Sequence, residues 1–127
     1  MDKQVRKIIK HALELIRPKG CWRKGAAAFD SSGHDCEPWS KKAKCFCWDG
    51  ALRRGVIDLG PKSKADRKKL LEASREVLAR AIAAHNRYAS QDLKAGNDFD
   101  EIIVDWNDVS RRTHKQAIEI GEIALAA

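Results

Sequence analysis

The sequence lacks any apolar run that approaches the roughly 20 residues needed to span a bilayer. Its first residues, Met1 to Gln4, also lack the apolar stretch of a secretory signal. These absences argue against a membrane protein and predict a cytoplasmic one. In a reducing compartment the four cysteines are expected as free thiols or metal ligands and not as disulfides.

The cysteines also lack the spacing of a structural zinc site. Such sites favour paired Cys-x2-4-Cys knuckles, whereas this chain offers only Cys36-x8-Cys45-x-Cys47. The residues with donor atoms suited to zinc are Cys21, His34, Cys36, Cys45 and Cys47. The acidic stretch 97–108 lacks the alternating acids and the glycine of an EF-hand loop, so calcium is not expected either. We therefore predict no metal and no other cofactor.

What the chain does have is enough apolar material for one hydrophobic core. Its 127 residues are 43% hydrophobic and 34% charged, which fits a single domain over residues 1–127. The net charge is +7, which suggests a polyanionic partner. The surplus is uneven, because residues 95–127 hold 3 of the 25 Lys and Arg but 7 of the 18 Asp and Glu.

Apolar residues recur at helical spacing, so the predicted fold class is all-α (mainly α), a compact domain of about five helices. The predicted helices cover residues 3–17, 41–54, 63 to about 88, a shorter stretch after Asn97, and a last one that opens at Thr113. Residues 19–40 are rich in Gly, Ser, Asp and Pro and are expected as a long loop. Residues 54–59 leave room for a short extended piece, and no pair of strands is expected.

Local capping signals support three of these helices. Asp2 is placed to cap the first helix, Ser63 with Asp66 opens the long one, and Thr113 with Gln116 has the pattern of a capping box. The buried face of the long helix is expected to end at His85, and Trp106 is expected to fill the core.

Three stretches carry a resemblance to a known family. They are Gly20-Cys21-Trp22 with Gly25-Ala26, then Phe46-Cys47-Trp48-Asp49-Gly50-Ala51-Leu52, then Trp106-Asn107-Asp108 with Thr113-His114. In this order they resemble an uncharacterised family of small bacterial and phage proteins, in which a tryptophan usually stands at the position of Phe46. The resemblance implies a helical single domain and supplies no activity, substrate or cofactor.

Cys47 is the candidate nucleophile, with His114 as its base and Asn107 or Asp108 as the group that orients the base. The opposing interpretation is structural. Cys47 falls in an apolar helical stripe, where a buried thiol behaves as a small inert hydrophobe and Gly50 allows another helix to approach closely. Asn107 and Asp108 likewise suit turn and cap positions near the last helix.

Binding has two sets of candidates. Lys64, Arg67, Lys68 and Arg75 share one face of the long helix, a pattern that suits a phosphate backbone. Their alternative is a solvated face, because glutamates interleave with these cations at i, i+4 spacing. The tryptophans Trp22, Trp39 and Trp48 either mark an interface or cover the core.

The sequence therefore leaves the biochemical function unknown. Our best interpretation is a non-enzymatic binding or interaction protein of bacterial or phage origin, with a protein or nucleic acid as its partner and no membrane. The alternatives are a small enzyme that uses Cys47 and His114, and a nucleic-acid-binding protein that uses the basic long helix.

Overall fold

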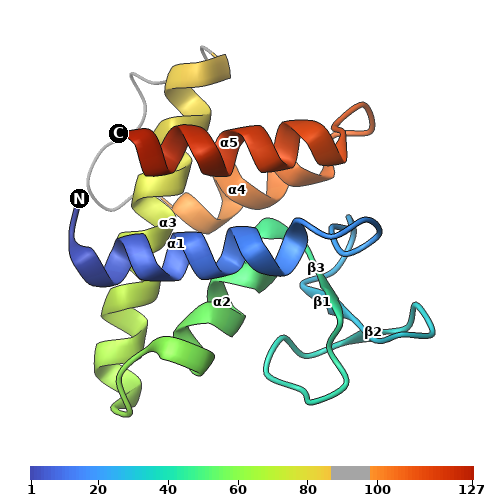
Figure 1. Cartoon of the computed structure of the whole chain (residues 1–127), viewed down its shortest axis with the longest axis horizontal. Coiled ribbons are helices and arrows are strands. Elements are labelled where there is room, and N and C mark those ends of the chain that lie inside the picture. The colour runs from blue at the N-terminus through green and yellow to red at the C-terminus, as the bar shows by residue number, and fades with distance from the viewer. Residues whose placement is uncertain (87–97) are drawn as a thin grey trace.

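The computed structural model of the chain describes residues 1–86 and 98–127, which form five helices and three two-residue strands (Figure 1). The helices are α1 (Lys3–Ile16), α2 (Trp48–Leu59), α3 (Lys64–Asn86), α4 (Phe99–Asp108) and α5 (His114–Ala126). The strands are β1 (Ala28–Phe29), β2 (Asp35–Cys36) and β3 (Cys45–Phe46). The predicted fold class, a mainly α domain of five helices, is confirmed.

Helix α1 crosses in front of α3 and packs against α2, α3 and α5 (Figure 1). It begins where expected, because the Asp2 carboxylate accepts hydrogen bonds from the amides of Gln4 at 2.8 Å and Val5 at 3.1 Å. Its apolar stripe is buried as the spacing predicts. The buried residues are Val5, Ile8, Ile9, Ala12, Leu13 and Ile16.

The segment between α1 and α2 contains a small antiparallel sheet in the order β2-β1-β3. Ala28 of β1 lies opposite Cys36 of β2 and Phe46 of β3. The expectation that this region has no paired strands is therefore wrong. Strands of two residues are too short to show an alternating pattern, and long-range backbone pairing holds them together.

Helix α2 begins and ends later than expected. The predicted helix over 41–54 is wrong at its start, because residues 45–46 form β3 and Cys47 is the N-terminal cap. The extended piece suggested for 54–59 is also wrong, since these residues are helical. Gly55 does not break the helix but faces α1, where an added Cβ would lie 3.4 Å from Ile8.

The remaining helix ends follow their capping signals. The Ser63 hydroxyl accepts a hydrogen bond from the amide of Asp66 at 3.3 Å, and the capping box of Thr113 and Gln116 is formed. His85 is exposed and does not join the buried face of α3. The expected end of this helix near residue 88 and the expected cap Asn97 lie outside the described residues.

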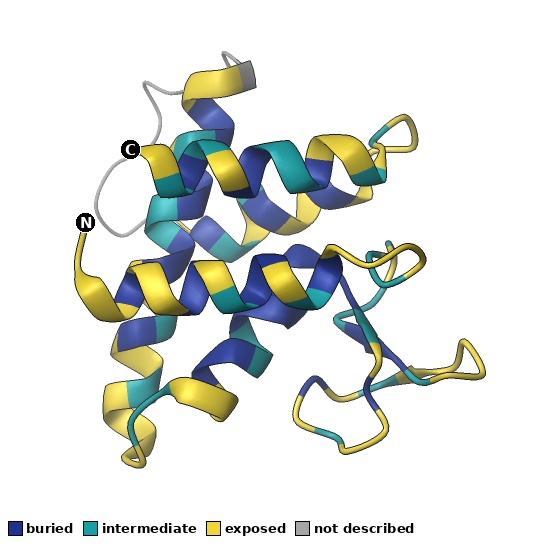
Figure 2. Cartoon of the chain, in the orientation of Figure 1, coloured by how far each residue is buried: buried dark blue, intermediate teal, exposed yellow. Residues whose placement is uncertain are grey.

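The core lies where the five helices face one another (Figure 2). Trp48 lies at its centre, fully buried, and its indole N–H donates to the carbonyl of Ala117 at 2.9 Å. Gly121 of α5 lies directly against this ring, since a Cβ there would come within 2.9 Å of it. None of the helices in the described ranges is long and apolar enough to cross a membrane.

Candidate functional site

Trp22, Cys47 with Trp48, and Asn107 with Asp108, which come from three family-like stretches, meet at one buried point, which we call the Asn107 junction. The fully buried Asn107 side chain accepts hydrogen bonds from the Trp22 indole at 2.7 Å and from the Trp48 amide at 3.0 Å. Its amide group donates to the Arg23 carbonyl at 3.2 Å and to Asp108 at 3.0 Å. One side chain thus joins the segment before β1, the start of α2 and the end of α4.

Asp108 and Cys47 also belong to this junction, and each accepts a hydrogen bond from a backbone amide. The Asp108 carboxylate accepts from the amide of Gly25 at 3.2 Å, and the Cys47 sulfur accepts from the amide of Gly50 at 3.3 Å. Together Cys47 and Asn107 satisfy two of the amides that every helix N-terminus leaves unpaired. Cys47 and Asn107 therefore cap α2 from two directions. The sequence suggested instead that Asn107 and Asp108 accept hydrogen bonds from loop amides near the last helix.

The Cys47 thiol is poorly suited to nucleophilic attack. Its pKa is raised to about 11, mainly by burial and in smaller part by the nearby carboxylates of Asp49 and Asp108, against the opposing effect of the Gly50 amide. Only the thiolate attacks, so this thiol is almost entirely unreactive at neutral pH.

The candidate base His114 is engaged elsewhere. Its Nε2 lies 2.6 Å from the carbonyl oxygen of Ile16, and its ring stacks on Trp22 with 6.1 Å between centroids. The four catalytic candidates thus bond to backbone groups, to Trp22 or to one another, and they do not converge on an open cleft.

The close approach at Gly50 is real, but its partner is not a helix. A Cβ at Gly50 would overlap the carbonyl group of Ala27, which belongs to the segment leading into β1. The same carbonyl accepts a hydrogen bond from the Cys47 amide at 3.2 Å. The expected contact between two helices at this glycine is therefore corrected to a contact between α2 and the sheet.

The residues with donor atoms suited to zinc do not gather at one point, although Cys21 and Cys45 are neighbours. His34 is exposed in the β1–β2 turn, Cys36 is half-buried in β2, and Cys47 is buried at the start of α2. The Cys45 thiol donates to the carbonyl of Gly20 at 3.1 Å, next to Cys21. In the portions 1–86 and 98–127, no three His, Cys, Asp or Glu residues gather as a metal site would require.

A second set of residues lines a concave surface between α2 and α3, which we call the α2–α3 groove. It has a volume of about 490 Å³. Its lining residues are Trp39, Arg53, Val56, Ile57, Lys64, Arg67, Lys68, Leu71 and Arg75. Five of the seven binding candidates from the sequence thus share one surface, while Trp48 lies in the core and Trp22 in the Asn107 junction.

The cations of this groove differ in their partners. Arg75 is buried at the inner end, where it donates to Asp49 at 2.7 and 2.9 Å and to Glu72 at 2.8 Å. The Asp49 carboxylate also lies 3.3 Å from Arg53. No ion pair with Lys64, Arg67 or Lys68 is seen in the part of the chain that the structure describes. These three cations carry the uncompensated charge of the groove, and Arg75 serves the packing of α2 on α3.

Trp39 is held at the rim of the groove with 57% of its surface exposed. The neighbouring Pro38 is fully buried, and the Arg54 guanidinium donates to the carbonyls of Pro38 at 3.0 Å and Ser40 at 2.9 Å. Asp58 accepts a further hydrogen bond from Arg54 at 3.1 Å. Arg54 therefore fixes the loop on α2 and directs Trp39 outward, a role that its place in a run of cations did not reveal.

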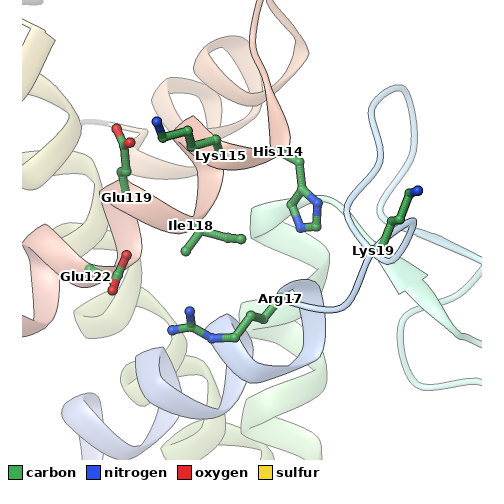
Figure 3. A pocket seen from close by; sticks show the side chains of 7 residues that line it. All are labelled: Arg17, Lys19, His114, Lys115, Ile118, Glu119 and Glu122. Atoms are coloured by element: carbon green, nitrogen blue, oxygen red, sulfur yellow. The ribbon is translucent and has the colours of Figure 1, made fainter.

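A further hollow lies between the end of α1 and the first turns of α5 (Figure 3). It has a volume of about 420 Å³ and includes the family-like residue His114. Its lining residues are Arg17, Lys19, His114, Lys115, Ile118, Glu119 and Glu122. Because cations and carboxylates are mixed here, the hollow has no clear preference for a ligand of one charge.

The fold and these surfaces define a small, mainly helical domain with a buried polar junction and one cationic, aromatic groove. The chain belongs to the family of unknown function DUF6197, whose model matches residues 1–126. No curated protein and no solved structure shows a significant match to the chain. The resemblance to an uncharacterised family is thus confirmed, while its motif pattern and a bacterial or phage origin stay predictions.

Proposed function

We propose that the protein is a non-enzymatic binding protein and that the α2–α3 groove receives an anionic partner with a flat or apolar part. The observation that carries this proposal is the meeting of an exposed tryptophan with three uncompensated cations on one concave surface. Trp39 comes from the loop before β3, and Lys64, Arg67 and Lys68 come from the first turns of α3. Distant parts of the chain thus supply complementary chemistry to one site.

The alternative of a solvated helix face fits this region less well. It required glutamates to neutralise the cations of α3. Glu76 does pair with Arg80 at 2.8 Å, as that alternative expects, but Glu72 pairs with Arg75 at 2.8 Å and not with Lys68. Glu72 is therefore occupied by the buried arginine at the inner end of the groove, and the charges of Lys64, Arg67 and Lys68 remain available to an anion.

The apolar surface of the groove supports the same proposal. Ile57, which is 43% exposed, lines the groove together with Trp39, Val56 and Leu71. Clusters of exposed large apolar residues rimmed by polar ones mark interaction sites more often than isolated apolar residues do. A partner that covers this floor gains burial of apolar surface in addition to charge pairing.

The second candidate from the sequence, a thiol enzyme, gains no support from the geometry. Its thiol is buried with a raised pKa, and the side chain of its candidate base is hydrogen-bonded to α1. Both groups act in the packing of the domain.

The test uses heparin as a general polyanion and the intrinsic fluorescence of the protein as the readout. Trp48 and Trp106 are buried and Trp22 is half-buried, so Trp39 is the tryptophan that a ligand in the groove would perturb most. We expect a saturable change that is absent from Trp39→Phe and strongly weakened in the triple variant Lys64→Glu, Arg67→Glu, Lys68→Glu.

The matched control reverses the same number of charges on α1, at Lys3, Lys7 and Lys10, which are all exposed. Both triple variants have the same net charge. Equal loss of heparin binding in the two would show a nonspecific charge effect and would refute the groove as the site.

A further inference from the structure

We infer that the partner of the α2–α3 groove is a single-stranded nucleic acid. The inference rests on the proposed function, since it names the chemical class of the anion that the groove receives. It comes from three features of the groove: an open aromatic face, a line of cations beside it, and an apolar floor.

The open aromatic face belongs to Trp39. Proteins that bind single strands stack unpaired bases on exposed aromatic side chains, and this stacking tolerates every base. Arg54 and the buried Pro38 hold the backbone on both sides of Trp39, so the indole stays at the rim before a ligand arrives. A loop that is already held in place loses little conformational freedom on binding, and this favours a stacking role.

Three cations of α3 share the groove with this ring. Arg67 and Lys68 lie three and four positions after Lys64, a spacing that places their Cβ atoms about 5–6 Å from that of Lys64. Lys41 and Lys44 follow Trp39 in its loop and are also exposed, outside the lining of the groove. A chain of phosphates can follow such a line and neutralise several cations at once, whereas a compact anion would meet only one or two.

The apolar floor argues against duplex nucleic acid. The bases of a duplex are stacked on one another, so they can meet Trp39 and Ile57 only after local opening, which costs free energy. A single strand presents base faces and sugars to such a floor without that cost. An acidic peptide would satisfy the cations, but it lacks a base to stack on the indole. The chain's net charge of +7 further favours a polyanion as partner.

The experiment measures fluorescence anisotropy with three labelled probes: a 12-nucleotide oligo-dT strand, the same strand annealed to oligo-dA, and a 12-residue polyglutamate. We expect the single strand to bind at least tenfold more tightly than either of the others at moderate salt. Trp39→Ala should weaken single-strand binding about tenfold while Trp39→Phe retains most of it. Circular dichroism checks that both variants are folded, as expected for a residue at the rim.

A salt series supplies a second readout. The slope of log K against log salt concentration is about −0.7 for each phosphate contact to a single strand. The triple variant Lys64→Gln, Arg67→Gln, Lys68→Gln should therefore reduce the slope by about 2. The same neutralisation at Lys3, Lys7 and Lys10 should leave it unchanged.

The outcomes separate this inference from the proposed function. Equal or tighter binding of the duplex or of polyglutamate, or unchanged single-strand binding by Trp39→Ala, would overturn the assignment to single strands. If heparin still binds through the groove in that case, the proposed function stands and only the class of partner is wrong. If none of these anions binds through Lys64, Arg67 and Lys68, both proposals fall together.

Discussion

Replacing Asn107 by alanine should destabilise the domain more than any other polar substitution at the Asn107 junction. The change removes the acceptor of two buried donors, the Trp22 indole N–H and the Trp48 amide. It also removes the donor that serves the Arg23 carbonyl and Asp108. A buried donor left without a partner costs about 1–3 kcal/mol.

Counting only the two orphaned donors, we expect a loss of about 2–6 kcal/mol in the free energy of unfolding. This is a large share of the total stability of a small domain, roughly 5–15 kcal/mol. Urea unfolding followed by circular dichroism measures the loss, because α2 contributes helical signal and loses part of its N-terminal capping. Lys7→Ala, on the exposed face of α1, is the control and should change the stability by less than about 0.5 kcal/mol.

A companion substitution, Asn107→Asp, separates the two hydrogen bonds that Asn107 accepts from the two that it donates. It keeps an acceptor for Trp22 and Trp48 but places a carboxylate against the Arg23 carbonyl and Asp108. Burial and the neighbouring Asp108 disfavour the charged form, so the destabilisation should shrink as the pH falls and the introduced group takes up a proton. A loss below about 1 kcal/mol for Asn107→Ala, or a pH-independent effect of Asn107→Asp, would refute the junction as a stabilising element.

Three further predictions concern the start of α2 and the groove. Cys47→Ala should cost about 1 kcal/mol for the lost cap. The wild-type stability should fall between pH 9 and 11, because the unfolded Cys47 thiol ionises first, and this fall should be steeper than in the variant, which keeps only the smaller effect of the raised pKa of Cys45; an equal slope in both chains would contradict the raised pKa of Cys47. Gly50→Ala should prevent normal folding because its Cβ overlaps the carbonyl of Ala27, whereas Gly55→Ala, with its nearest contact at 3.4 Å, should melt within a few degrees of wild type; similar melting temperatures for the two would refute the steric argument. Arg54→Met should free the loop that carries the exposed tryptophan, which would appear as faster depolarisation of its fluorescence and weaker heparin binding, and unchanged values would show that this arginine does not position the ring.

The parts of the fold that could be predicted from the sequence are those determined by neighbouring residues. The stripe of α1 and the caps at Ser63 and Thr113 depend on side chains three or four positions apart, and all three are confirmed. The sheet was missed because its pairing is long-range. The stripe that included Cys47 was assigned to a helix because small apolar residues suit a buried strand and a buried helix equally well.

The groove was predictable in its parts but not as a whole. The basic residues of α3 and the unassigned Trp39 were both recognised as binding candidates. Their meeting depends on the turn between α2 and α3 and on the hydrogen bonds of Arg54, which no local pattern contains. In the same way, Asp49 and Arg75 are 26 positions apart, so their ion pair could not be foreseen.

The hydrogen bonds of Asn107 also have a consequence for the order of events during synthesis. Its partners Trp22 and Trp48 lie 85 and 59 positions earlier in the chain. The start of α2 therefore has no hydrogen-bond acceptor from Asn107 until the ribosome has released residue 107. Closing chain loops of 59 and 85 residues also costs entropy before these contacts form. We expect the nascent chain to form its helices early and to pack α2 stably against the sheet only near the end of translation. Truncated chains that stop before α4 should therefore remain sensitive to proteolysis around residues 20–47.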